Sequence, residues 1–135
     1  MSGRVYIDDS GVPMNVRGRT IAVIDDDLRV LESLVNLLAS FGYKAESYNS
    51  AEHFLESGSL SRTSCVVTDV EMRQMSGLGL LRYLKNSNHT VPVIVITGKP
   101  PARPEAFYLE SGAVGFFRKP LDGDALVELI GSVRV

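Results

Sequence analysis

Five apolar segments, separated by stretches with helical periodicity, are the feature that most limits how this chain can fold. Three of them are continuous and rich in β-branched residues, which suits strands buried on both faces of a parallel sheet. The second segment alternates polar and apolar residues, as a strand at the edge of a sheet can. The segments are 21–24 (IAVI), 43–48 (YKAESY), 65–68 (CVVT), 91–97 (VPVIVIT) and 113–117 (AVGFF).

Helical patterns fill the intervals between these segments. The first interval predicts an amphipathic helix that ends at Gly42, a residue suited to a C-terminal cap. Ser50, Ser76 and Asp122 are candidate N-caps of three further helices, because their side chains can accept backbone N–H groups. The expected inward face of the first helix comprises Leu28, Leu31, Leu34 or Val35, Leu38 and Phe41.

Prolines at positions 100, 101 and 104 shift the start of the helix after the fourth strand toward the C-terminus. Pro104 fits the first turn of this helix, so we expect a short helix near 105–111. The order is therefore five strand–helix units in one α/β domain. Right-handed crossovers and this size favour a flavodoxin-like fold, a parallel five-stranded sheet of order 2-1-3-4-5 with helices on both faces. Residues 19–135 would form this domain, and 1–18 a poorly ordered, flexible extension.

Composition excludes several classes of function. A net charge of −2 argues against a domain built mainly to bind nucleic acid. The chain has no basic amphipathic stretch, no apolar run near the roughly 18 residues that span a bilayer, and no signal peptide, so we expect a cytoplasmic protein. The single cysteine, Cys65, rules out an internal disulfide and lies in an apolar run, which predicts a small buried core residue.

Charged and polar residues follow the predicted strands at the edge where ligands bind in such sheets. Neighbouring carboxylates repel one another unless they share a hard cation, and Mg²⁺ prefers carboxylates, water and phosphate oxygens. A carboxylate flanked by Mg²⁺ and a lysine could attack a phosphoryl group, while a hydroxyl donates to a phosphoryl oxygen. The residues concerned are Asp25, Asp26 and Asp27 at the end of the first strand, Asp69 at the end of the third, Thr97 at the end of the fourth and Lys119 after the fifth.

Five features in order, "VIDDD", Asp69, "MSG", Thr97 and "KP", make residues 19–133 resemble the receiver domain of two-component response regulators. The segments "VVTDVEMRQMSGLGLL" and "VPVIVITG" resemble the FixJ-like group of receivers. The resemblance implies that Asp69 accepts a phosphoryl group from a sensor histidine kinase or a histidine phosphotransfer protein. It also implies Mg²⁺ or Mn²⁺, bound by Asp25, Asp26, Asp69 and the backbone carbonyl of Glu71.

The resemblance implies roles for the residues around the acceptor. Lys119 would contact the phosphoryl group and precede Pro120 through a cis peptide bond. Thr97 would be the switch hydroxyl, and Phe116 takes the position of the family's switch aromatic residue. Phosphorylation would change the surface of the fourth helix, fifth strand and fifth helix, which would contact an unknown downstream protein or a second copy in a homodimer. No direct contact with nucleic acid or a membrane is implied.

Some residues depart from the family's pattern. Arg73 replaces the proline of the usual "MPxMSG", and Glu71 adds a negative charge near the acceptor. We hypothesise that Glu71 changes the lifetime of the phosphoryl group by controlling access of water. The three prolines after Thr97 should shorten the helix on the face commonly used for output.

Alternative functions remain open. A phosphatase of the haloacid-dehalogenase type is disfavoured because "DDDLR" does not match its "DxDGT" signature. We expect a phosphoacceptor that hydrolyses its own acyl phosphate, rather than a turnover enzyme. The main alternative is an interaction module that acts without phosphorylation. FixJ-like proteins continue into a DNA-binding domain that this sequence does not include, so we expect either a single-domain regulator or part of a longer protein.

Overall fold

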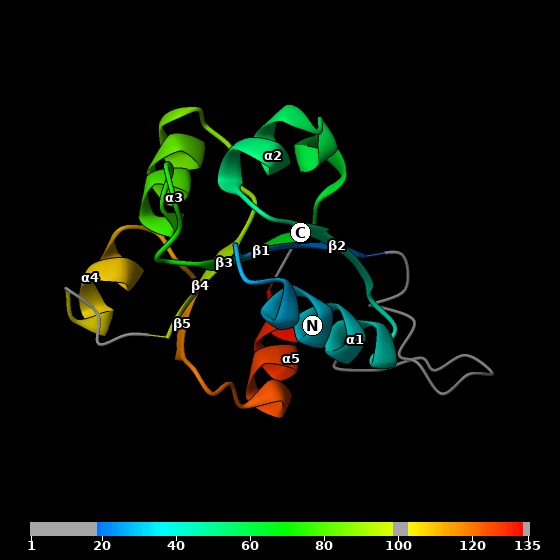
Figure 1. The fold of residues 1–135 in the computed structure, drawn as a ribbon. Helices are drawn as coiled ribbons and strands as arrows, with labels where there is room; N and C mark the ends of the chain where they lie inside the picture. Colours follow the sequence, from blue (N-terminus) through cyan, green and yellow to red (C-terminus); the bar gives the residue numbers. More distant parts are fainter. Residues whose placement is uncertain (1–18, 99–102, 134–135) are drawn as a thin grey trace, which may run out of the picture.

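The structure, a computed structural model, describes residues 19–98 and 103–133, and it has one five-stranded parallel sheet covered by helices on both faces (Figure 1). The strand order is β2-β1-β3-β4-β5, so the predicted flavodoxin-like fold is confirmed. The strands are β1 (Thr20–Ile24), β2 (Lys44–Tyr48), β3 (Cys65–Asp69), β4 (Val93–Thr97) and β5 (Gly115–Arg118). The helices are α1 (Leu28–Ser40), α2 (Ala51–Glu56), the 3₁₀ helix η2 (Ser59–Arg62), α3 (Gly77–Asn86), α4 (Glu105–Glu110) and α5 (Gly123–Ser132). The extension predicted over 1–18 lies outside the described residues.

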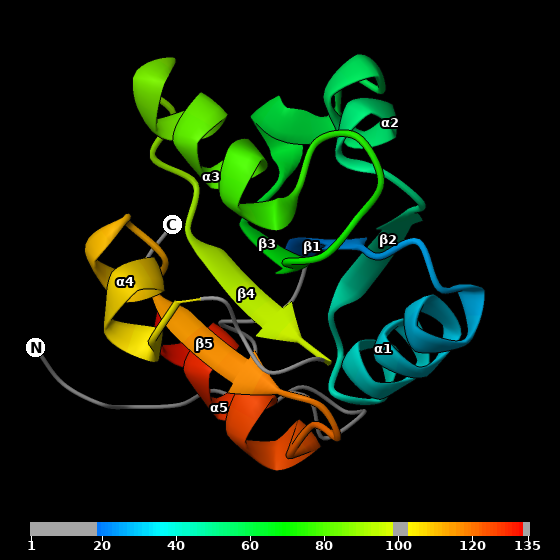
Figure 2. The same cartoon turned by 60° about the vertical axis from the view of Figure 1, so that its left-hand side comes forward.

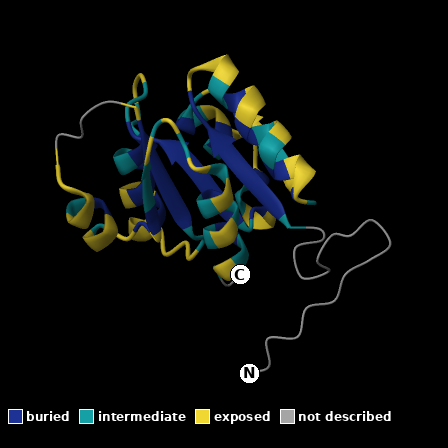
Figure 3. Cartoon of the chain, turned by 90° about the horizontal axis from the view of Figure 1, so that it is seen from below, coloured by how far each residue is buried: buried dark blue, intermediate teal, exposed yellow. Residues whose placement is uncertain are grey.

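The helices form two layers, with α2, α3 and α4 on one face of the sheet and α1 and α5 on the other (Figures 1 and 2). Successive strand residues point to opposite faces, so β1 contributes Ala22 and Ile24 to one core and Ile21 and Val23 to the other. Figure 3 shows the consequence at the centre of the sheet, where β1, β3 and β4 are buried between the two helical layers, whereas the edge strands β2 and β5 are partly exposed.

Hydrogen bonds at the helix ends explain where the helices begin. Asp27, Ser50, Ser76 and Asp122 each have an extended backbone and accept a backbone N–H two or three residues further on. These caps satisfy donors that a helix leaves unpaired at its first turn. The C-terminal signal at Gly42 is also confirmed, since its φ of 93° is the left-handed conformation that glycine adopts most easily.

Three details of the sequence analysis are wrong. Leu28 is 68% exposed, because it begins α1 at the rim of the sheet, beyond the last buried residue of β1. Phe41 is also exposed, because α1 ends at Ser40 and the helical stripe does not continue past it. Pro104 lies at the N-cap of α4 with an extended ψ of 160°, one position before the first turn in which we expected it.

Cys65 is a buried core residue, as its apolar surroundings predict, and burial raises the pKa of its thiol to about 12. Within the described part of the chain, every helix is too short or too polar to cross a membrane.

Candidate functional site

The parallel register brings the carboxyl ends of four strands to one edge of the sheet. Asp69 at the end of β3 pairs with Ile96, the residue before Thr97 at the end of β4. Asp25 and Asp26 directly follow β1, and Lys119 directly follows β5. The structure therefore gathers the carboxylates, hydroxyl and ammonium that the sequence analysis selected.

Asp25 is the most deeply buried carboxylate of the site, with 2% of its surface exposed. One oxygen, Oδ1, accepts the backbone N–H of Asp27 at 2.9 Å, and the other, Oδ2, accepts the Lys119 ammonium at 3.0 Å. Asp27 itself is exposed and accepts the N–H of Arg29 as the N-cap of α1. The two neighbours thus differ in role, since Asp25 faces the site and Asp27 begins a helix.

Asp69 is 7% exposed, and its Oδ1 has no hydrogen-bond partner among residues 19–98 and 103–133. The Lys119 ammonium lies 3.7 Å from this oxygen, too far for a hydrogen bond but close enough for attraction. Burial raises the pKa of Asp69 to about 7, with a further contribution from Asp25, while Lys119 opposes the rise. A proton, a metal cation or a covalent partner at this poorly solvated carboxylate would each relieve the cost of its burial.

The oxygen-rich cluster fits a hard divalent cation. Asp25, Asp26 and Asp69 each offer a carboxylate oxygen, and these oxygens lie within 4.8 Å of one another. Asp26 is exposed, so a cation could enter from solvent and keep several water ligands, as Mg²⁺ commonly does. Three convergent carboxylate oxygens with access to water are the hard ligands that Mg²⁺ prefers, so the residues present suit this ion.

Lys119 is held in place by its carboxylate neighbours. Burial alone would lower the pKa of its ammonium, but the hydrogen bond that it donates to Asp25 and the charges of Asp25 and Asp69 raise this pKa above the usual value. Gly98 leaves room for this side chain, because a Cβ at that position would lie 3.2 Å from the Lys119 Cδ. The peptide bond to Pro120 is cis.

Thr97 is 1% exposed, and its hydroxyl donates a hydrogen bond of 2.8 Å to Oε1 of Glu71. The negative charge of Glu71 near the acceptor is evident from the sequence, but this contact with Thr97 is not. The sequence signal was only positional, since Glu71 follows the end of β3 closely and Thr97 ends the neighbouring strand β4.

Phe116, at the position of the family's switch aromatic residue, is partly buried in β5. Its ring stacks on the ring of Tyr108 from α4, with centroids 5.2 Å apart and planes at 29°. Tyr108 is itself buried, so the two rings connect the middle of β5 to α4 through packing.

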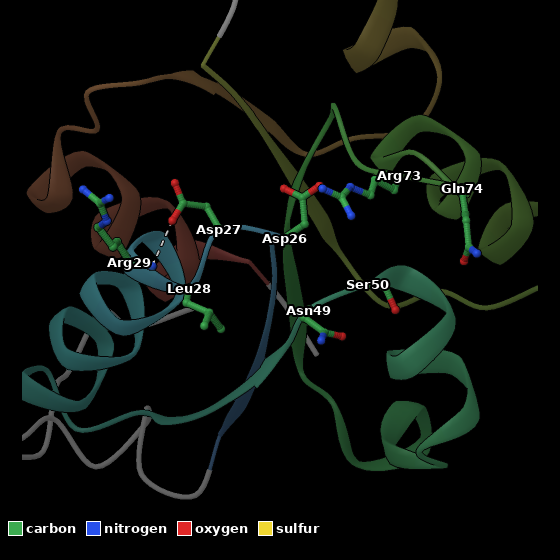
Figure 4. Close-up of a pocket in the computed structure, with 8 residues that line it drawn as sticks. All are labelled: Asp26, Asp27, Leu28, Arg29, Asn49, Ser50, Arg73 and Gln74. Carbon is green, nitrogen blue, oxygen red and sulfur yellow. Dashed lines mark hydrogen bonds between the residues drawn. The ribbon is translucent and has the colours of Figure 1, made fainter.

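The loop between β3 and α3 borders a pocket of about 700 Å³ at the mouth of the site (Figure 4). The side chain of Arg73 extends from this loop toward Asp26, so a positive charge faces the exposed carboxylate. Gln74 has a φ of 60°, a left-handed conformation uncommon outside glycine. The Met75 N–H donates to Glu52 of α2, which fixes the loop to the neighbouring helix.

Comparison with known proteins gives a consistent result. Residues 21–131 match the family model described as response regulator receiver domain. The chain is 37% identical over 121 residues to the response regulator protein TodT of Pseudomonas putida, covering 90% of this chain and 52% of that protein. It is 35% identical over 111 residues to the transcriptional regulatory protein FixJ of Rhizobium meliloti, covering 82% and 54%. The chain thus spans about half the length of these relatives.

A solved structure has the same fold. The crystal structure of FixJ-N superposes with a TM-score of 0.77 and 32% sequence identity, covering 87% of this chain and 96% of that one.

Proposed function

The chain belongs to the response regulator receiver domain family, and from this premise we propose that Asp69 is the residue that accepts a phosphoryl group in two-component signalling. The observation that carries the proposal is the Asp69 carboxylate, nearly buried beside Lys119, with an oxygen that has no hydrogen-bond partner in the described part of the chain. The donor would be the phosphohistidine of a sensor kinase or a histidine phosphotransfer protein.

The proposed reaction is a phosphoryl transfer from nitrogen to oxygen. One Asp69 oxygen forms a bond to phosphorus as the bond between phosphorus and the donor imidazole breaks, and the imidazole nitrogen keeps the electron pair. Lys119 lies close enough to Asp69 to offset the negative charge that arrives with the phosphoryl group. Hydrolysis of the resulting acyl phosphate restores the free carboxylate and releases inorganic phosphate.

Receiver domains bind Mg²⁺ at an acidic pocket, and the cluster of Asp25, Asp26 and Asp69 is such a pocket here. We assign the three carboxylates and the backbone carbonyl of Glu71 as ligands, for which Mn²⁺ is an alternative. When bound, the ion would neutralise charge shared by the carboxylates and the phosphoryl oxygens.

The output would follow from Thr97 and Phe116. Phosphorylation would draw the Thr97 hydroxyl toward a phosphoryl oxygen and alter the packing of Phe116 on Tyr108, which would change the α4–β5–α5 surface. We propose that residues 19–135 act as this switch in the cytoplasm, on a downstream protein or through a homodimer. A phosphorylation-independent interaction module is the alternative.

Intact-mass spectrometry after incubation with acetyl phosphate and Mg²⁺ tests the proposal. We expect a single phosphoryl adduct on the wild type and on Asp124→Asn, a control at an exposed carboxylate of α5. We expect no adduct on Asp69→Asn or after chelation of the metal. Equal labelling of Asp69→Asn would contradict the proposal, and no labelling of the wild type would favour the interaction module.

A further inference from the structure

We propose that Glu71 is a positioning residue that competes with the phosphoryl group for the Thr97 hydroxyl and so sets how readily the switch responds. The inference rests on the proposed function of Asp69 as phosphoacceptor. It concerns a specific contact between two side chains, and it is separate from our hypothesis that Glu71 controls access of water.

The contact joins two strands. Glu71 follows Asp69 by two residues in the loop after β3, and Thr97 ends the neighbouring strand β4. The distance of 2.8 Å between Thr97 Oγ1 and Glu71 Oε1 is that of a good hydrogen bond. Because Thr97 is almost fully buried, the position of its hydroxyl is set by protein neighbours.

The direction of this hydrogen bond follows from the chemistry of the two groups. An ionised carboxylate has no proton to give, so the threonine must be the donor. A hydroxyl has only one proton, and a phosphoryl oxygen is likewise only an acceptor. The proton that Thr97 gives to Glu71 is therefore the one that phosphorylated Asp69 would need, and the two contacts compete.

Charge makes the competition responsive to phosphorylation. The Glu71 carboxylate is near enough to Asp69 to help raise the pKa of the Asp69 carboxyl. A phosphoryl group brings more negative charge to the same place, which disfavours the Glu71 carboxylate beside it. Before phosphorylation, the Thr97 hydroxyl donates its hydrogen bond to Glu71. After phosphorylation, charge repulsion weakens this hydrogen bond, and the phosphoryl oxygens become the stronger acceptors.

The affinity of metal-loaded protein for beryllium fluoride, a mimic of the phosphoryl group, tests the competition. We expect Glu71→Ala to bind the mimic about tenfold more tightly than the wild type, a change of about 1.4 kcal/mol. Glu71→Gln, which keeps an acceptor oxygen without the charge, should fall between them. Glu56→Ala, which removes an exposed carboxylate at the end of α2, should bind as the wild type does.

A second background separates the hydrogen bond from the general effect of charge. Thr97→Val keeps the shape of the side chain and removes its hydroxyl. If Glu71 acts partly through Thr97, Glu71→Ala should tighten binding clearly less in this background than in the wild-type background, because only the effect of charge remains. An equal tightening with and without the hydroxyl would overturn the inference, since it would show charge repulsion alone.

Exchange of the Thr97 hydroxyl proton with water, measured by NMR in metal-free and unphosphorylated protein, distinguishes failure of this inference from failure of the proposed function. We expect faster exchange of this proton in Glu71→Ala than in the wild type, because the acceptor of its hydrogen bond is lost. Equal exchange in the two proteins would overturn the role of Glu71 even if Asp69 is phosphorylated. Conversely, a wild type that binds no mimic would count against the proposed function, while the exchange rate would still report whether Glu71 accepts this proton.

Discussion

At the scale of single residues, Asp69 lies in surroundings that oppose its ionisation. Burial and the neighbouring Asp25 raise its pKa from 3.8 to about 7, so the folded protein holds a proton there over a range in which the unfolded chain has lost it. The contribution of protonated Asp69 to the free energy of unfolding is therefore complete below about pH 4, and it is lost as pH rises through 7. A shift of this size corresponds to at most about 4 kcal/mol.

Asp69→Asn should stabilise metal-free protein at pH 8, because the amide cannot ionise and carries no charge to repel Asp25. The gap in unfolding free energy between variant and wild type should grow from pH 4 to pH 8 and narrow when Mg²⁺ is added. Urea denaturation at several pH values, with a chelator present, measures this gap. A gap that does not depend on pH would contradict the assigned environment of Asp69.

Lys119→Met should leave Asp25 buried without its cation. Asp25 keeps the N–H of Asp27, and a quarter of the Lys119 side chain is exposed, so we expect a loss of about 2 kcal/mol, below the range for fully buried pairs. Urea denaturation of metal-free protein at pH 7 measures it, with Lys85→Met, at an exposed position on α3, as the control. Equal stability of both variants would show that Lys119 does not compensate Asp25.

The site residues could be predicted from the sequence where a residue ends a strand or directly follows one. Asp25, Asp69 and Thr97 could be brought together from strand order alone, because parallel strands end at one edge. The hydrogen bond between Glu71 and Thr97 depends on the path of a loop and on two side-chain rotamers, which a linear pattern does not determine.

At the scale of elements, the start of α3 lies against the end of β3. Gly77 is the first residue of α3, and its N–H donates to the carbonyl of Val70. A Cβ at Gly77 would overlap the carbonyl oxygen of Asp69, which is backbone and cannot rotate away. The glycine therefore allows the close approach that positions the acceptor strand.

Gly77→Ala should destabilise the protein by about 2 kcal/mol, because overpacking forces the backbone of Asp69 to shift. Gly131→Ala is the matched control in α5, where a Cβ would make an ordinary contact of 3.5 Å with the Tyr43 hydroxyl. Removing a helical glycine there should stabilise by about 0.5 kcal/mol. Chemical denaturation of the two variants measures both changes, and effects of the same sign would refute this packing argument.

The elements themselves were largely predictable, since caps and strand periodicity are local signals. Ser50, Ser76 and Asp122 begin the helices that we expected from them. The 3₁₀ helix η2 gave no signal, because its four residues are too few to show an apolar period. The exposure of Leu28 was missed because periodicity does not reveal where the core ends.

At the scale of the whole molecule, the sheet order and the division into two helical layers followed from five apolar segments and short connections. The acidic cluster should make the stability of the fold depend on metal. Three carboxylates held within 4.8 Å repel one another in the folded state, so a divalent cation that binds there should stabilise that state.

Mg²⁺ should therefore raise the free energy of unfolding, by about 2.7 kcal/mol at a concentration one hundred times the dissociation constant. Asp26→Asn removes an exposed ligand, so it should weaken this effect while leaving metal-free stability within about 0.5 kcal/mol of the wild type. Thermal denaturation with and without a chelator measures both quantities. Full stabilisation of Asp26→Asn by Mg²⁺ would place the ion elsewhere.

The most direct test of the central claim is to locate the phosphoryl group. After reaction with acetyl phosphate and Mg²⁺, borohydride reduces an aspartyl phosphate to homoserine, and peptide sequencing by mass spectrometry then identifies the altered position. We predict homoserine at position 69 only, and none in a sample treated with a chelator. Homoserine at Asp25 or Asp26, or none at any position in protein that carries the adduct, would contradict the assignment of Asp69 as the phosphoacceptor.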